Sequence, residues 1–306
     1  MKIADGHCDY LYQKSRKQPT VISYSTLKQS RVNIQNFALF ASKQGGSIES
    51  SEKILQEYQK QIQIFKDDFI NRTDCVFIKS KNDFDNNSVL HVLLSLEGCD
   101  ILAYSSDFFD QLWNLGARIF GLTWNHDNAF ATCCHTKKNT GLTFKGIEFM
   151  HKLSKNHAIV DVSHLSEQSF WDIIALNESQ PTIIASHSNS KTVCNHVRNL
   201  SDGQIKAIIS SGGVIGINYV PEFLNEEKEK ATMDDVIRHI DTIIKHGGEN
   251  VVALGSDFDG AALIKELNSP HSLQILSYRL NKEFGDKIAN KVMFENWKNF
   301  LLDRLP

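Results

Sequence analysis

The 306-residue chain lacks the features that define several large classes of protein. It has no apolar run of about 18 to 20 residues, which a membrane-spanning helix needs, and its first residues lack the apolar core of a signal peptide. Its formal net charge is −3, with acids and bases interspersed, which gives no sign of a nucleic-acid or anionic-membrane partner. We therefore expect a cytoplasmic protein that binds neither nucleic acid nor a membrane.

Cysteines are few and form no recognised pattern. No two stand in the Cys-x-x-Cys spacing of a zinc knuckle, and a chain of this length needs no disulfide framework. We therefore expect reduced thiols at all six positions, which are Cys8, Cys75, Cys99, Cys133, Cys134 and Cys194. Cys133 and Cys134 beside His135 could bind a metal adventitiously, but a loop without function is the simpler interpretation.

Glycine and proline are scattered, and no stretch of them marks a linker, so we expect one domain over residues 1–306. What the chain does contain is a series of short apolar runs, many of them continuous rather than alternating. Such runs are typical of strands that are covered on both faces of a parallel sheet. Eight can be identified, at residues 2–4, 33–40, 89–96, 117–122, 158–162, 182–185, 213–218 and 251–254.

Helical patterns alternate with these runs. The clearest covers residues 232–245, where five branched apolar side chains share one face and Thr232 with Asp235 resembles a capping box. Further helices are expected at residues 47–69, 144–154, 167–176 and 202–210, with the stretch 271–306 forming helices on the outside. This alternation predicts an α/β fold, a (β/α)8 TIM barrel with extra C-terminal helices. A doubly wound sheet is the alternative, but no Gly-x-Gly-x-x-Gly follows any expected strand.

Histidines and carboxylates follow the expected strands, where a TIM barrel carries its active site. His7 and Asp9 follow the first strand, Glu97 ends the third, His164 follows the fifth and His187 the sixth. Each alone could be structural, but together they indicate a metal site. Imidazole and carboxylate suit Zn²⁺, and five ligands suit two ions if one carboxylate bridges them.

Two further residues are candidates for the chemistry. Asp257 follows the eighth strand and could move a proton, or could serve as a turn residue, a role that suits Asp259 better. Arg198 lies in the loop after His187 and could bind a substrate carboxylate through two hydrogen bonds. A surface salt bridge is the simpler interpretation of a single arginine.

The segments that carry these residues resemble the membrane (renal) dipeptidase family of zinc metallopeptidases, which is amidohydrolase-like. The matching order extends from residue 3 to about residue 302. The matching segments are Asp5-Gly6-His7-Cys8-Asp9, Leu96-Glu97-Gly98, Leu122-Thr123-Trp124-Asn125-His126, Asp161-Val162-Ser163-His164, Ser186-His187-Ser188 and Gly255-Ser256-Asp257-Phe258-Asp259-Gly260.

The resemblance implies two Zn²⁺ ions in a TIM barrel. It assigns His7 and Asp9 to one ion, His164 and His187 to the other, and makes Glu97 the bridge. It also implies that Asp257 transfers the proton and that Arg198 binds the substrate's C-terminal carboxylate. The implied reaction is hydrolysis of dipeptides, including those with a C-terminal D-residue, by a hydroxide that bridges the two metals. A homodimer is suggested by the same resemblance.

The fourth strand departs from the family's pattern. Well-studied members carry a substrate-binding histidine directly after Leu-Thr, whereas here Trp124 holds that position and His126 comes two residues later. His126 is therefore the candidate for substrate binding and oxyanion stabilisation, from a shifted backbone position.

The alternatives to a dipeptidase are another binuclear amidohydrolase, acting on N-acyl amino acids, lactones or β-lactams, and a metal-binding scaffold with little turnover. A barrel enzyme without metals would need a glycine-rich phosphate loop late in the chain, and residues 255–260 are too acidic for one.

Overall fold

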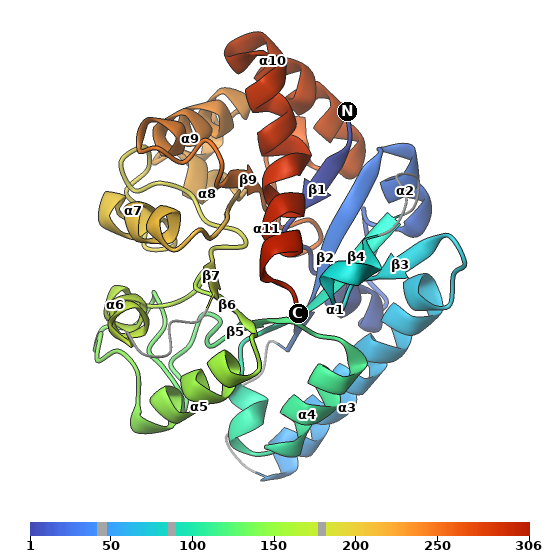
Figure 1. The fold of residues 1–306 in the computed structure, drawn as a ribbon, viewed down its shortest axis with the longest axis vertical. Helices are drawn as coiled ribbons and strands as arrows, with labels where there is room; N and C mark the ends of the chain where they lie inside the picture. The colour runs from blue at the N-terminus through green and yellow to red at the C-terminus, as the bar shows by residue number, and fades with distance from the viewer. Residues whose placement is uncertain (42–47, 85–89, 177–181) are drawn as a thin grey trace.

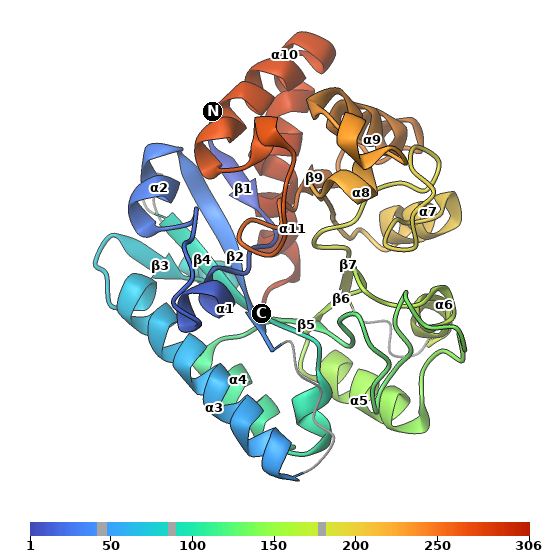
Figure 2. The same cartoon turned by 180° about the vertical axis from the view of Figure 1, so that it is seen from behind.

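The computed structural model describes residues 1–41, 48–84, 90–176 and 182–306. Eight parallel strands run around a nearly closed barrel in the order β7-β6-β5-β4-β2-β1-β9-β8 (Figures 1 and 2). A parallel bridge between Ala185 and Ile215 joins the two ends of this order. The predicted TIM barrel is confirmed. Its strands are β1 (Ile3–Asp5), β2 (Val32–Phe40), β4 (Leu90–Glu97), β5 (Ile119–Gly121), β6 (Ile159–Asp161), β7 (Thr182–Ile184), β8 (Ile215–Ile217) and β9 (Val252–Leu254).

All eight expected strands are present, although residue 89, the expected start of the third, lies outside the described residues. A further strand, β3 (Cys75–Phe77), pairs in parallel with β4 beside the barrel and was not predicted.

Helices cover the outer face of the barrel (Figure 1). The expected helices correspond to α3 (Ile48–Phe65), α5 (Phe144–Lys155), α6 (Glu167–Ala175), α7 (Asp202–Ser210) and α9 (Met233–Lys245), and residue 47 lies outside the described part. Thr232 and Asp235 form the expected capping box at the start of α9. Further helices are α1 (Tyr10–Ser15), α2 (Tyr24–Gln29), α4 (Asp107–Leu115) and α8 (Pro221–Leu224). Within the described ranges, no helix combines the length and the apolar character that a membrane crossing requires.

The C-terminal helices differ in part from the expectation. Helix α10 (Leu273–Asn290) and helix α11 (Asn296–Arg304) are joined by a π-helical turn at Lys291–Glu295. Trp297, Phe300 and Leu301 of α11 pack against inward-facing strand residues such as Ala4 and Leu93. Helix α11 therefore lies across one end of the barrel (Figure 1) rather than covering only its wall. The reason is that the barrel interior offers these apolar side chains a buried surface.

Candidate metal centre

The five predicted ligands meet at the carboxyl ends of four strands, and each side chain is buried. Glu97, the last residue of β4, lies at the centre. Its Oε2 is 3.6 Å from Nε2 of His7, and its Oε1 is 2.9 Å from Nε2 of His164 and 3.6 Å from Nε2 of His187. Asp9 joins the cluster with Oδ2 3.4 Å from Nε2 of His7. One carboxylate thus faces imidazoles on both sides, as a bridging ligand would.

The pKa shifts of the side chains in the cluster favour the binding of a cation. Burial lowers the pKa of His7, but the carboxylates of Glu97 and Asp9 outweigh this effect and raise that pKa to about 10. Burial holds the pKa of His164 and of His187 well below the ordinary value, with Arg198 and His7 adding to the effect. Burial likewise raises the pKa of Glu97, more than His7 lowers it. A bound cation would relieve these costs of buried carboxylates.

Two buried polar atoms of the cluster, Nε2 of His7 and Oδ1 of Asp9, have no hydrogen-bond partner among the described residues. Buried polar atoms are seldom left unpaired, and a metal ion is one of the partners that can satisfy them. Ligand atoms of His7, Glu97 and His187 lie within 4.8 Å of one another, as do those of His7, Asp9 and Asp257. The residues therefore fit metal ions, and their mixture of imidazole and carboxylate suits zinc.

The second ring nitrogen of two candidate ligands, His164 and His187, has a defined partner. Nδ1 of His164 lies 2.9 Å from Oδ1 of Asn125, and Nδ1 of His187 lies 2.7 Å from Oγ of Ser186. Neither partner was singled out from the sequence. The available signal was chemical, because a metal-binding histidine needs an acceptor for its other ring nitrogen.

His126 lies elsewhere. The residue is exposed, and its ring lies 5.6 Å from that of Trp124. It does not line the cavity that opens beside Glu97, His164 and His187. Trp124 and Asn125 line the cavity instead. The shift of two residues along this segment thus leaves His126 outside the lining of the cavity.

The two aspartates after β9 have different partners. Asp257 is buried beside His7 and Asp9, and its Oδ2 accepts a hydrogen bond of 3.0 Å from Nδ2 of Asn218. Burial raises the pKa of Asp257 to about 6, although His7 opposes the shift. Asp259 instead accepts hydrogen bonds from the backbone N–H groups of Val21 and Ile22, so it holds a loop in place. The sequence alone did not determine which of Asp257 and Asp259 is the turn residue and which is the candidate for proton transfer.

The carboxylates of Asp9 and Asp257 both pack against the backbone of Gly260. A Cβ atom at this glycine would overlap the carboxylate oxygens of both aspartates. Glycine is therefore required here by the approach of two side chains to its backbone.

Arg198 is buried, with only 3% of its surface exposed, so a surface salt bridge is the wrong interpretation of this residue. Its guanidinium donates hydrogen bonds to the carbonyl oxygens of Ser163 and His187, and Nη2 lies 3.1 Å from Nε2 of His164. The arginine is thus held rigidly against the cluster, in the wall of the adjoining cavity.

This cavity has a volume of about 290 Å³ and opens beside Glu97, His164 and His187. His135 lines it, so the loop at residues 133–135, interpreted from the sequence as a loop without function, borders the candidate site. The backbone N–H of Cys134 donates to the carbonyl of His164 at 2.9 Å, which ties this loop to a predicted ligand. None of the six cysteines forms a disulfide in the structure.

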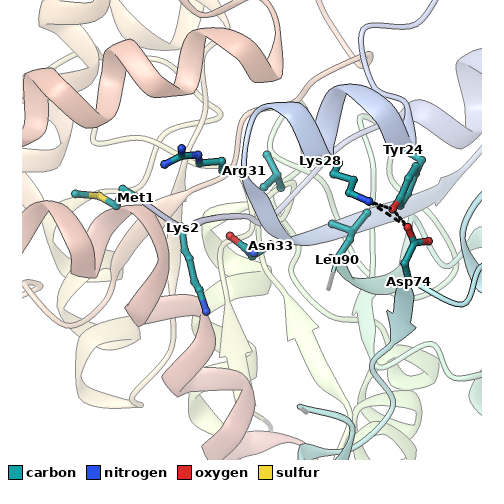
Figure 3. A pocket seen from close by; sticks show the side chains of 9 residues that line it. Met1, Lys2, Tyr24, Lys28, Arg31, Asn33, Asp74 and Leu90 are labelled. Atoms are coloured by element: carbon teal, nitrogen blue, oxygen red, sulfur yellow. Dashed lines mark hydrogen bonds and ion pairs between the residues drawn. The ribbon is translucent and has the colours of Figure 1, made fainter. Parts of the chain in front are cut away.

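A second cavity, of about 420 Å³, opens at the amino ends of β1, β2 and β4, the face opposite the cluster (Figure 3). Two residues of its wall form an ion pair, with Nζ of Lys28 3.3 Å from Oδ2 of Asp74. Its wall is formed by Met1, Lys2, Tyr24, Lys28, Arg31, Val32, Asn33, Asp74 and Leu90.

Comparison with known proteins agrees with this architecture. A sequence model of the family described as membrane dipeptidase (peptidase family M19) matches residues 1–301. An uncharacterized protein from the pqqA 5′ region of Klebsiella pneumoniae is 32% identical over 225 residues, which cover 70% of this chain and 82% of that protein. An uncharacterized dipeptidase of Schizosaccharomyces pombe is 34% identical over 196 residues, which cover 61% of this chain but only 47% of the yeast protein.

Among solved structures, a metallo peptidase from Rhodobacter sphaeroides, liganded with a phosphinate mimic of the dipeptide L-Ala-D-Ala, superposes with a TM-score of 0.89. Its sequence is 21% identical, and the match covers 100% of this chain and 99% of that one. The predicted family, barrel and enzyme class are confirmed: the chain belongs to the membrane dipeptidase family of metallo-dipeptidases.

Proposed function

We propose that the protein is a zinc-dependent dipeptidase that hydrolyses the peptide bond of dipeptides, including those with a C-terminal D-residue. The observation that carries the proposal is the convergence of three imidazoles and two carboxylates on one buried point, with ring and carboxylate atoms left unpaired by the described residues. The dipeptide mimic bound by the Rhodobacter sphaeroides structure supports the substrate class.

Two zinc ions would be held by this cluster. His7 and Asp9 would bind one ion, His164 and His187 the other, and Glu97 both, because its two oxygens face opposite sets of imidazoles. Zinc bound there would supply polarisation of the peptide carbonyl and activation of water at neutral pH.

Asp257 would move the proton of the reaction. Its carboxylate is fixed by Asn218 at 3.0 Å and lies in the same group of acids and imidazoles as His7 and Asp9. From this position it can take a proton from the attacking water and deliver it to the leaving amine, which is general acid–base catalysis.

Arg198 would bind the C-terminal carboxylate of the substrate. The guanidinium is already ordered by two backbone carbonyls, so little side-chain entropy is lost when it binds an anion. Binding of the C-terminal carboxylate at the cavity wall would limit the substrate to two residues. We assign no substrate contact to His126, because it is exposed and outside the cavity wall.

The test is metal analysis of the purified protein combined with a panel of substrates. We expect about two zinc ions per chain and release of free amino acids from L,L- and L,D-dipeptides. Glu97→Gln should abolish both metal binding and turnover. No bound metal and no turnover after zinc addition would overturn the proposal, and turnover of N-acyl amino acids or lactones without dipeptides would replace it with a different amidohydrolase.

A further inference from the structure

Behind His187 lies a buried network that the proposed reaction does not use. Asp161, the last residue of β6, accepts four hydrogen bonds, two from backbone N–H groups and two from hydroxyls. Oδ1 receives the N–H groups of Ser163 at 3.1 Å and Ser186 at 3.0 Å, and the hydroxyl of Ser163 at 2.6 Å. Oδ2 receives the hydroxyl of Ser186.

Both hydroxyls also contact His187. Oγ of Ser163 accepts the backbone N–H of His187 at 3.2 Å, and Oγ of Ser186 lies 2.7 Å from its Nδ1. A carboxylate only accepts hydrogen bonds, so each serine gives its single hydrogen to Asp161. Ser186 has no hydrogen left to donate and must accept one from the imidazole.

We propose that Asp161 is a positioning residue that fixes the tautomer and orientation of His187 through two serine hydroxyls, and so presents Nε2 of this imidazole as the metal-binding atom. The inference rests on the proposed zinc site. Hydrogen on Nδ1 leaves the lone pair on Nε2, which lies 3.6 Å from Oε1 of Glu97. The hydroxyl of Ser163 bonds the backbone of His187, and the hydroxyl of Ser186 bonds its ring. Because both hydroxyls donate to Asp161, this one carboxylate fixes the backbone and the ring of His187.

The amide variant Asp161→Asn gives the sharpest test, because it keeps the shape of the side chain. Two backbone N–H groups point at the position of Oδ1 and cannot turn away, so the amide oxygen must occupy that position. The NH₂ group then faces Ser186, whose hydroxyl accepts from it and donates to Nδ1 of His187, which at 2.7 Å is nearer than the other available acceptor, Oγ of Ser163 at 3.3 Å. This reversal places hydrogen on Nε2 and blocks the metal-binding atom.

Zinc affinity should be measured by competition with a chromophoric chelator. We expect Ser186→Ala to weaken one of the two zinc sites about 10- to 100-fold, and Asp161→Asn to weaken the same site more. Ser186→Thr, which retains the hydroxyl, should restore much of the affinity. Ser188→Ala is the matched control, since Ser188 is 1% exposed, adjoins His187, and its Oγ has no hydrogen-bond partner in the part of the chain described.

The tautomer itself can be read by ¹⁵N NMR of histidine-labelled protein after removal of metal. We expect the Nδ1–H tautomer of His187 in the unsubstituted chain and the Nε2–H tautomer in Asp161→Asn. An Nε2–H tautomer in the unsubstituted chain, or zinc affinities in Asp161→Asn and Ser186→Ala equal to that of Ser188→Ala, would overturn the inference. Failure to bind zinc in the unsubstituted chain would instead overturn the proposed function, because the tautomer is measured without metal.

Discussion

Nε2 of His164 lies 2.9 Å from Nε2 of His187, and both atoms face the same oxygen of Glu97. The two imidazoles come from adjacent strands, β6 and β7, but 23 residues apart in the chain. Each ring has its other nitrogen held by a separate partner, Asn125 for His164 and Ser186 for His187. The orientation of each ring is thus fixed by the partner of its Nδ1 atom, as is usual for histidines that bind metals.

The role of Asn125 can be separated from that of His126. Asn125→Ala removes the acceptor 2.9 Å from Nδ1 of His164 and should weaken zinc binding about 10- to 100-fold. Asn125→Asp keeps an acceptor and should bind zinc nearly as tightly as the unsubstituted chain. His126→Ala should change the free energy of unfolding by less than about 0.5 kcal/mol, as exposed positions usually do, and leave kcat/KM unchanged. A large loss of kcat in His126→Ala would assign it the catalytic role that the sequence suggested.

Arg198→Ala should raise KM for free dipeptides about 10- to 100-fold, since hydrogen bonds to charged groups contribute about 1.5–3 kcal/mol. C-terminal amides of the same dipeptides lack the negative charge and should be affected much less. The comparison is made by steady-state kinetics on both substrate series. Because Arg198 also bonds the carbonyls of Ser163 and His187, metal content and thermal unfolding must be measured alongside. Equal losses on the two series would show that the arginine acts only in holding the site together.

Gly260→Ala should reduce turnover at least about 100-fold. The added methyl group would overlap the carboxylates of Asp9 and Asp257 and force both from their positions, and misplaced catalytic groups commonly cost about that factor. Gly203→Ala, where the nearest atom would lie 3.4 Å from the new Cβ, is the matched control and should be active. Activity in Gly260→Ala equal to this control would contradict the close approach of the two carboxylates.

Stability should fall in acid through His239 of α9. This side chain is fully buried, its Nδ1 accepts the N–H of Ser190 at 3.1 Å, and burial lowers its pKa from 6.5 to about 4. The folded chain therefore binds fewer protons here than the unfolded chain below pH 6.5. The stabilisation present above pH 6.5 is lost as the pH falls toward 4, by up to about 3 kcal/mol.

Chemical denaturation of the unsubstituted chain and of His239→Asn, between pH 7.5 and pH 4, measures this contribution. Asparagine retains an acceptor near Nδ1 but does not titrate. The difference in unfolding free energy between the two proteins should shrink as the pH falls. Two parallel curves would mean that His239 is protonated as readily in the folded chain as in the unfolded one.

The barrel and its cluster of candidate ligands could be predicted because both leave local signals. Buried parallel strands are continuous apolar runs, and His7, Glu97, His164 and His187 each lie at or just after the end of one. The fold class and the gathering of these four side chains at one rim follow from that placement alone.

What the sequence did not predict depends on contacts between distant residues. Asn125 reaches His164 across 39 positions and Ser186 reaches Asp161 across 25, and no local pattern marks either pair. Whether Asn125 or His126 lines the cavity depends on the direction of one backbone segment, which residue spacing does not determine. The location of α11 depends on which buried surface its apolar face meets.

The packing of α11 has a consequence for how the protein is made. Trp297 lies directly under Gly6, where a Cβ would overlap the indole, and its Nε1 donates to the carbonyl of Leu254 at 2.9 Å. The segment that carries His7 and Asp9 leaves the ribosome nearly 300 residues before the helix that supports it from below. These two candidate ligands are therefore synthesised long before their support exists, so we expect the proposed metal site to bind tightly only after α11 has been translated and docked.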